Sequence, residues 1–516
     1  MAIRTTPETP SSDYEAMLPA WTKVETILDG QAAMQAAGTT YLPQFPNETD
    51  ADYEYRRQNA KFTNIYADIV ENLSSKPFSE EVTLDEGAGD RFKQLAEDID
   101  GRGNNLHVFA SEVFFGGVNC AVDWIFVDFT KARPRPDGQP LSLADEKSQG
   151  LRPYWVRVPA KRMLAAYTDT VRGKEIFVHA RMLETVTRRD GWGEVAVNRI
   201  RVLNREPIFE TVGGTVTDRV VDYAPATFEV WEKKTRGNGR LTSSWSMVES
   251  GAVTIGEIAL VPFVTGRRKG AGWQFSLPLQ GVADLQVEHF QAETALKHIK
   301  ELTAFPMLAG NGVQPQMQDN GPVAVPVGPQ AVLYAPPFGD SGQHGEWTFI
   351  EPSAESLKFL AEEVAAIETQ MRELGRQPLT ATAGITVVTA ALASQKASSA
   401  VQAWALALKD ALEQAFMFTA KWLNVQATEA PQVKVFTDFA MEANDEKGPT
   451  SLMEARRNGD LSRRTLWAEY QRRGILSGDF DADAEEQALE EEAPDPDAAL
   501  DLTGALTPPD PEALAA

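Results

Sequence analysis

Hydrophobic positions recur at two different spacings along this chain, and the change of spacing divides it into helical and β-rich regions. Over residues 14–130 apolar side chains recur every three or four positions, which predicts mainly helices. From about residue 154 to 264 short runs rich in Val, Ile, Thr and aromatic residues alternate with turn residues, which predicts strands. The charged, proline-containing residues 131–149 predict an exposed loop. The expected strands are 154–158, 175–186, 195–203, 227–232 and 259–264.

Two long helical patterns then enclose a segment without positive charge. The first predicts a helix at 278–304, with apolar positions in steps of four and three. Residues 305–352 contain no Lys or Arg, seven glycines and eight prolines, yet they carry apolar runs that predict a small β-rich module. A second helix is expected at 353–375, where the three–four alternation is strictest and Gly375 ends it. The apolar runs of the enclosed segment are 323–327, 331–335 and 347–350.

The remaining residues predict a loop, a long helix and a small C-terminal part. Residues 376–389 are rich in Thr and Ala, and a proline and a glycine interrupt them, so we expect a loop. A long helix is expected at 390–428, and a short strand and two short helices are expected within 429–478. The acidic, proline-containing residues 479–516 predict disorder. The strand is expected at 433–439 and the short helices at 451–458 and 462–473.

The negative charge of the chain is concentrated at its C-terminal end. The formal net charge is −25, and residues 479–516 hold thirteen Asp or Glu and no Lys or Arg, which leaves −12 for the rest. This acidic body excludes a tight DNA clamp, because sequence-independent binding comes from Lys and Arg that neutralise phosphates. It does not exclude a pore through which DNA slides without being held. The length of 516 residues implies roughly two to four structural units.

Catalytic and metal-binding signals are weak. The glycine-rich residues 266–272 lack the spacing and the Lys-Ser/Thr ending of a phosphate-binding loop. The five histidines lack metal-ligand spacing, and no carboxylate pair is distinguished as acid and base. The single cysteine, Cys120, lies among apolar residues, where a thiol is more often buried and inert. We therefore expect no enzyme, cofactor or metal site, and we expect neither export nor a membrane span.

Short motifs follow one another along the chain in an order that resembles a known family. They are Trp21 with Gly30, Tyr41-Leu42-Pro43, Tyr53-Glu54-Tyr55-Arg56-Arg57, Asn64, Val261-Pro262-Phe263-Val264, Leu277-Pro278-Leu279, Ala283-Asp284-Leu285, His289-Phe290-Gln291, Pro306, Leu308, Gly310, Thr380-Ala381-Thr382, Asp438-Phe439, Gly459-Asp460-Leu461-Ser462 and Arg472-Arg473-Gly474. Together with the order helix, β module, helix, loop and long helix, they resemble phage portal proteins, in particular the portal-like family DUF4055. The resemblance covers about residues 14–490. The chain departs from the family at Gln286, where Asn is frequent, and at Phe290, where Tyr is frequent.

The resemblance implies an α+β portal fold and a role in the virion. It implies a homo-oligomeric ring of twelve subunits at the capsid vertex, assembled in the host cytoplasm. Double-stranded DNA would pass through the ring without sequence specificity during packaging, retention and ejection. The implied partners are terminase, head–tail adaptor proteins and the major capsid protein. The implied parts are the wing (1–277), stem helices (278–304 and 353–375), clip (305–352), tunnel loop (376–389), long wing helix (390–428), crown (429–478) and acidic tail (479–516).

Residues of the loop and the stem are the candidates for contact with DNA. On the stem, acidic side chains such as Glu293 are expected to repel phosphate, while the few basic ones make weak contacts. Intersubunit ion pairs on a solvated face explain the stem charges equally well, and the loop has an alternative reading as a surface connection. Another capsid or head–tail structural protein, or a packaging enzyme such as a terminase, remain alternative functions. The loop candidates are Arg376, Gln377, Thr380, Thr382 and Thr386, and the stem candidates are Lys297, Lys300, Lys358 and Arg372.

Overall fold

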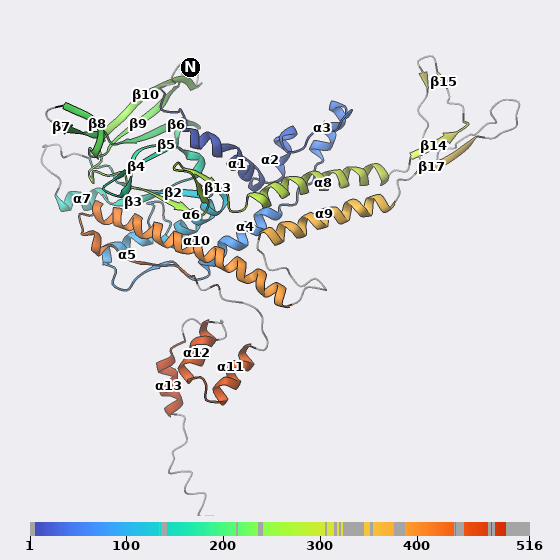
Figure 1. The fold of residues 1–516 in the computed structure, drawn as a ribbon. Coiled ribbons are helices and arrows are strands. Elements are labelled where there is room, and N and C mark those ends of the chain that lie inside the picture. Colours follow the sequence, from blue (N-terminus) through green and yellow to red (C-terminus); the bar gives the residue numbers. More distant parts are fainter. Residues whose placement is uncertain are drawn as a thin grey trace, which may run out of the picture. The chain divides into compact units, whose positions relative to one another are not determined.

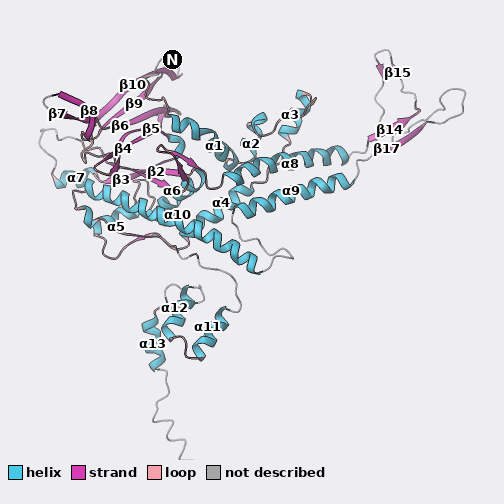
Figure 2. Ribbon diagram, in the orientation of Figure 1, coloured by secondary structure: helices cyan, strands magenta, loops and turns pink. Residues whose placement is uncertain are grey.

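The chain forms two units, Met1–Phe439 and Ala440–Ala516. The first unit combines helices with antiparallel sheets, and the described part of the second is helical (Figure 1, Figure 2). The fold class is therefore α+β, as the sequence predicts. The computed structural model describes residues 6–133, 135, 142–212, 215–235, 241–304, 307–313, 317–318, 321–322, 345–350, 354–375, 387–437, 439, 448–472, 476 and 480–491.

Short polar side chains fix the starts of the helices in the N-terminal region. The side-chain oxygens of Ser11, Thr49, Asn64 and Asn105 each accept a hydrogen bond from a backbone N–H of the helix that follows. Such caps satisfy donors that have no partner within the helix. The helices are α1 (Ser12–Leu28), α2 (Gln31–Ala36), α3 (Asp50–Gln58), α4 (Ile65–Ser75), α5 (Asp90–Glu97) and α6 (Leu106–Cys120).

A three-stranded antiparallel sheet in the order β11–β2–β3 lies within the core of the first unit. Its central strand is buried over residues 122–127, because α6 and a later helix, α10, both contact this sheet. The sequence analysis assigns this part of the chain to helices and misses the strand. A strand buried on both faces has a continuous apolar run instead of the two-residue alternation. The strands are β2 (Val122–Phe129), β3 (Pro153–Val158) and β11 (Leu260–Val264).

A five-stranded antiparallel sheet in the order β10–β9–β6–β5–β4 occupies most of the predicted β region. The turn between β5 and β6 contains Gly191 at φ 60°, a conformation that glycine adopts without strain. Two further strands, β7 and β8, pair with each other. The sequence analysis misses β4, β7, β8 and β10. The strands are β4 (Met163–Val171), β5 (Lys174–Asp190), β6 (Gly193–Asn204), β7 (Pro207–Val212), β8 (Thr215–Tyr223), β9 (Thr227–Thr235) and β10 (Leu241–Ala252).

The charged segment between the two sheets contains a helix, α7 (Leu143–Gln149). Ser142 caps it, because its hydroxyl accepts from the N–H of Asp145 while the Asp145 carboxylate accepts from the N–H of Ser142. This reciprocal capping stabilises a first turn. The expectation of an exposed loop throughout residues 131–149 is therefore wrong for the residues of α7. Two short strands, β12 (Arg267–Lys269) and β13 (Gln274–Ser276), pair on either side of the glycine-rich turn.

Two long helices joined through a β hairpin follow. Both begin and end within two residues of the helices that the sequence predicts. In the hairpin, Met307 lies opposite Ile350 in an antiparallel pair of strands. Of the predicted apolar runs, 347–350 lies in this hairpin, and 323–327 and 331–335 lie outside the described residues. The elements are α8 (Gln280–Ala304), β14 (Met307–Asn311), β15 (Met317–Gln318), β16 (Gly321–Pro322), β17 (Glu346–Ile350) and α9 (Ala354–Leu374).

The long helix α10 (Val387–Trp422) begins three residues earlier than predicted, inside the expected loop, and ends six residues earlier. Its second half is buried against the three-stranded sheet. Phe416 packs edge-on against Trp155 of β3, with ring centroids 4.7 Å apart, and the Trp155 indole N–H donates to the Thr419 hydroxyl at 2.9 Å. The strand expected at 433–439 is shorter. It is β18 (Val433–Lys434), which pairs with β1 (Thr83–Leu84).

The second unit contains α11 (Gly448–Arg457), α12 (Arg463–Arg472) and α13 (Ala482–Glu491). The first two lie where short helices are predicted. The third lies inside residues 479–516, so the prediction of disorder is wrong for the residues of α13. Asp481 caps this helix by accepting from two backbone N–H groups, and Arg464 pairs with two of its carboxylates. The disorder prediction rests on acidic, proline-containing composition, which does not reveal the pairing with Arg464.

Candidate functional site

The helices α8 and α9 lie side by side and run in opposite directions (Figure 1). At one end, a Cβ on Gly281 of α8 would lie 3.9 Å from Cδ1 of Leu374, the last residue of α9. At the other end, the hairpin of β14 and β17 joins the two helices. With a rise of about 1.5 Å per residue, their 25 and 21 residues give lengths of about 37 and 31 Å. We call this helix pair the rod.

An apolar seam holds the two helices of the rod together. Ile367 and Met371 of α9 are buried and belong to the same hydrophobic cluster as Val282 and Phe290 of α8. The three–four spacing of the sequence brings these side chains to one face of each helix. Leu374, the last member of the predicted stripe, is 48% exposed, so the seam ends before the helix does.

Polar side chains on the buried face of α8 attach the rod to the segment that leads into α4. Gln286 accepts from the backbone N–H of Tyr66 at 2.9 Å and donates to the carbonyl of Thr63 at 2.9 Å. Lys297 donates to the carbonyl of Asn59 at 2.7 Å. These bonds satisfy backbone groups that would be costly to bury without partners. The first helix of the rod is thereby fixed at several points along its length.

Glu293 makes three of these attachments. Its carboxylate accepts from the backbone N–H of Thr63 at 3.0 Å, from the Thr63 hydroxyl at 2.8 Å and from the Lys61 ammonium at 2.8 Å. Burial raises the pKa of this carboxyl, but the hydrogen bonds and the charge of Lys61 outweigh burial and hold the pKa below its ordinary value. The prediction that Glu293 lies on a solvated polar face is wrong, because the residue is only 8% exposed.

His289 lies one turn before Glu293 and is also buried. Its Nδ1 has no hydrogen-bond partner among the described residues and lies 3.9 Å from a Glu293 carboxylate oxygen. Burial lowers the pKa of this imidazole, while the charges of Glu293 and of Glu368 act in the opposite direction. Because Glu368 belongs to α9, the imidazole lies within the electrostatic reach of both helices of the rod.

The second helix of the rod is attached to α4 near its C-terminal end. The Arg372 guanidinium lies 2.9 Å from the Asp68 carboxylate of α4 and 3.2 Å from Glu368 of its own helix. Gly375 follows the helix, and a Cβ at this position would lie 2.6 Å from Cγ2 of Ile69 in α4. Glycine therefore allows a close approach that a larger residue prevents. As a result, α4 contacts both helices of the rod.

A family comparison matches this same part of the chain. A family model described as a domain of unknown function, DUF4055, matches residues 278–423. The match begins two residues before α8 and ends one residue after α10, so it includes the whole rod, the segment between its helices, and the long helix. A search of curated protein sequences found no match.

Solved structures with some similarity come from gene transfer agent particles. The neck of the native particle, computed with C12 symmetry, is 11% identical, with 80% of this chain and 89% of that chain covered and a TM-score of 0.39. The virion of the native particle is 11% identical, with 85% of this chain and 97% of that chain covered and a TM-score of 0.37. The neck of the empty particle, computed with C6 symmetry, is 11% identical, with 87% of this chain and 99% of that chain covered and a TM-score of 0.39. TM-scores below 0.5 do not by themselves establish a shared fold.

The four basic stem candidates lie in different surroundings. Arg372 is engaged by two carboxylates, and Lys297 by a backbone carbonyl and, at 3.7 Å, by Glu301. The side chain of Lys358 is 78% exposed with a carboxylate of its own helix 3.7 Å away, and Lys300 is exposed. The geometry favours ion pairing within the chain for Arg372 and Lys297. Contact of any of the four with DNA stays a prediction.

The predicted channel loop lies almost entirely outside the described residues. Residues 387–389, at its expected end, belong to α10. The role of the loop in a channel therefore stays a prediction. The candidates outside the described residues are Arg376, Gln377, Thr380, Thr382 and Thr386.

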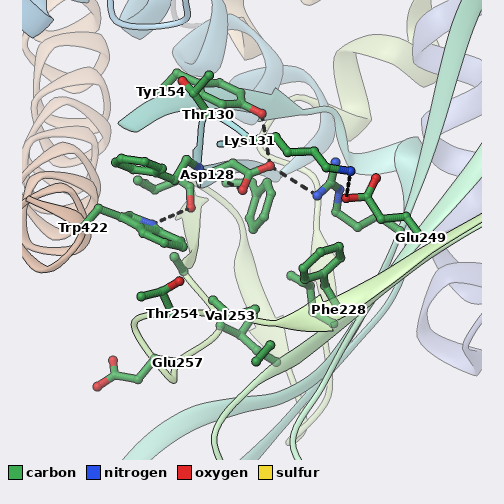
Figure 3. A pocket seen from close by; sticks show the side chains of 18 of the residues that line it. Asp128, Thr130, Lys131, Tyr154, Phe228, Glu249, Val253, Thr254, Glu257 and Trp422 are labelled. Atoms are coloured by element: carbon green, nitrogen blue, oxygen red, sulfur yellow. Dashed lines mark hydrogen bonds and ion pairs between the residues drawn. The ribbon is translucent and has the colours of Figure 1, made fainter. Parts of the chain in front are cut away.

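A cavity of about 470 Å³ lies elsewhere in the first unit, bordered by β2, β9, β10 and the end of α10 (Figure 3). Asp128 accepts from the Tyr154 hydroxyl at 3.1 Å and pairs with Arg201 at 3.2 Å. Across the cavity mouth, Lys131 pairs with Glu249 at 2.8 Å. The third carboxylate of the lining, Glu257, pairs with Lys421 at 2.6 Å. Each carboxylate of the described lining therefore has a cationic partner, and none is set apart as a catalytic acid or base.

Other chemistry is sparse in the described part of the chain. No group of three or more His, Cys, Asp or Glu is placed there to hold a metal ion. No described helix is long and apolar enough to cross a membrane. Burial raises the pKa of the Cys120 thiol to about 12, and a protonated thiol is a poor nucleophile.

The sequence analysis missed the attachment of the rod to the segment before α4. The available signal was the presence of Gln286, His289 and Glu293 on one face of a helix, since buried polar side chains need partners. It placed His289 in the packed stripe but Glu293 among the solvated residues. The partner could not be found from spacing, because Tyr66 and Gln286 are 220 residues apart.

Proposed function

We propose that this chain is a structural protein of a phage-like particle and, within that class, the portal subunit, a ring-forming and non-enzymatic protein whose channel passes double-stranded DNA. The observation that carries the proposal is the rod itself. It is joined by a hairpin at one end, attached to α4 at the other, and followed by the 36-residue helix α10. The family match to residues 278–423 covers this same unit, and the order of motifs along the chain supports the portal assignment.

The charge of the rod suits a channel that does not grip DNA. The helices α8 and α9 carry nine Asp or Glu and four Lys or Arg, a net charge of −5. Glu293 is buried and paired with Lys61, which leaves eight acidic and four basic residues, a net charge of −4. Such a charge repels phosphates, and exposed cations such as Lys300 and Lys358 offer weak, screened contacts. Cyclic symmetry would repeat this pattern around a channel.

Under this proposal twelve copies form a ring at the capsid vertex of the virion, after assembly in the host cytoplasm. The major capsid protein surrounds the ring, and terminase and then head–tail adaptor proteins dock on it. Residues 305–352 are the proposed docking clip, because they contain no Lys or Arg and interfaces are depleted in Lys. Residues 376–386 are the proposed constriction of the channel.

Electron microscopy and mass measurement of the purified full-length protein test the proposal. We expect rings with a central hole and a mass of twelve times 56.6 kDa, roughly 680 kDa. Closed shells would favour a capsid protein. Monomers at all concentrations, or DNA-stimulated nucleotide hydrolysis, would favour a packaging enzyme, and each of these results contradicts the portal assignment.

Deletion of residues 380–386 tests the channel loop. The rings should still assemble, while DNA packaging or retention should fall, because the loop is proposed to line the constriction. A deletion of residues 136–141, which lie within the loop that the sequence predicts at 131–149, is the control. It should leave ring assembly and DNA packaging unchanged. Normal packaging by the loop deletion would show that these residues do not act on DNA.

A further inference from the structure

The helices of the second unit carry opposite charges. Residues 448–472, which contain α11 and α12, hold five Arg and three Asp or Glu, a net charge of +2. Residues 480–491, which contain α13, hold six Asp or Glu and no Lys or Arg, a net charge of −6. A basic helix pair is thus followed by an acidic helix within the same unit. Figure 2 shows the three helices α11, α12 and α13.

The acidic segment of residues 480–491 contacts α12 through an arginine and an aromatic pair. The Nε of Arg464 donates to the Glu486 carboxylate at 3.0 Å, and its Nη2 lies 2.5 Å from Asp483 and 2.9 Å from Glu486. The rings of Trp467 and Phe480 meet edge-on, with centroids 5.6 Å apart. Two carboxylates therefore occupy the guanidinium in the way that phosphate oxygens would.

Two of the arginines lie where a helix is least stabilised by positive charge. Arg463 and Arg464 are the first two residues of α12, and the positive end of the helix dipole disfavours cations there. The side chain of Arg464 is 64% exposed, and Arg457 and Arg463 are also exposed. Charges that oppose helix stability and remain in solvent are typical of binding residues rather than of structural ones.

We propose that the exposed arginines of α11 and α12 form a binding surface for the phosphates of double-stranded DNA, and that α13 occupies one of them, Arg464, with two carboxylates as a partial cover. Guanidinium groups bind carboxylate and phosphate with the same forked geometry, so either can occupy Arg464. The choice of duplex DNA rests on the proposed function, which brings this ligand to the protein. Exposed ion pairs contribute little each, so DNA at high local concentration displaces the cover.

Binding of a fluorescently labelled duplex of 30 base pairs to full-length variants, measured by anisotropy over a series of salt concentrations, tests the proposal. Asp483→Asn with Glu486→Gln removes the cover and should tighten binding about 2- to 30-fold, from two exposed ion pairs. The salt dependence should steepen by about one phosphate contact. Glu485→Gln with Asp495→Asn is the matched control. It changes the net charge equally but keeps both partners of Arg464, and it should change affinity by less than about twofold.

Adding Arg464→Ala to the uncovered variant should cancel its gain, because that arginine is the proposed phosphate ligand. An equal gain in the control variant, or a gain that survives Arg464→Ala, overturns the inference. So does an uncovered variant that binds polyglutamate but not duplex DNA, since an acidic protein is then the better partner. Electron microscopy of the same preparations separates the two proposals. Absence of rings counts against the portal function, whereas intact rings without a gain in DNA binding count against this inference alone.

Discussion

Substitution of Glu293 by Ala tests the attachment of the rod at the point where the structure concentrates it. The change removes the acceptor for the N–H and the hydroxyl of Thr63 and the partner of Lys61, at a site where the glutamate is 8% exposed. A buried donor without an acceptor costs about 1–3 kcal/mol, and Thr63 is exposed, so its N–H and hydroxyl regain water in part and the cost lies in the lower part of this range. The Lys61 side chain is 58% exposed, so its ion pair adds no more than about 1 kcal/mol. We expect a loss of about 1–3 kcal/mol in the local stability of this contact.

Hydrogen–deuterium exchange of the Thr63 amide measures this loss, because that N–H donates to Glu293. A change of 1.4 kcal/mol is tenfold in an equilibrium, so exchange should accelerate roughly 5- to 150-fold. Glu293→Gln keeps the shape and one acceptor oxygen and should accelerate exchange less. Glu288→Ala, on the exposed face of the same helix, is the matched control and should leave it unchanged. An unchanged rate in Glu293→Ala, or an equal increase in the control, would refute the reasoning.

Three further substitutions test the surroundings of the rod and the core. His289→Gln should flatten the acid side of a profile of Tm against pH. In the wild type, burial holds the folded-state pKa of His289 below its ordinary value near 6.5. The stability that this residue contributes is therefore complete above that ordinary value and is lost as the pH falls through the folded-state pKa. Gly375→Val should cost about 1–3 kcal/mol in denaturant unfolding, because its side chain meets α4 at 2.6 Å, whereas Gly281→Ala, with its nearest neighbour at 3.9 Å, should be nearly neutral. Asp123→Ala should lower the free energy of unfolding by about 3–5 kcal/mol, because Asp123 is fully buried and lies 2.6 Å from Arg157. Replacing both residues by apolar ones should recover much of this loss in denaturant unfolding.

The helices of the rod could be predicted because local patterns determine them. The apolar positions of α9 repeat in steps of three and four, and Gly375 follows its last residue. The strand β2 could not be recognised in the same way. Its residues 122–127 are buried on both faces, so the apolar run 124–127 has no alternation that distinguishes a strand from a helix. The helix α13 was missed because composition gives the charge of a segment but not the partner that neutralises it, here Arg464.

The candidate site was predicted less completely than the fold, because its contacts join distant parts of the chain. Periodicity identifies which face of α8 is buried, but not that Thr63 and Asn59 supply the groups that bind it. Of the stem cations, Arg372 pairs with Asp68 of α4 and Lys297 donates to the carbonyl of Asn59, and sequence spacing alone could not identify these distant partners. The sign of each charge can be read from a sequence, whereas the residue that pairs with it can be identified only once the fold is known.

The polar attachment of α8 has a consequence for the proposed channel. Apolar contacts are not directional, so a seam of apolar side chains alone would let the rod rotate about its long axis or slide along it. Gln286 and Glu293 accept hydrogen bonds from the backbone N–H groups of Tyr66 and Thr63, and Lys297 donates to the carbonyl of Asn59, so these bonds fix the rotation and the height of α8. Under the proposed function each copy in a ring must present the same face to the channel, since an error in one rod changes the contacts of both neighbours. The buried polar residues of the rod are therefore better explained as the means of aligning it than as contacts for DNA.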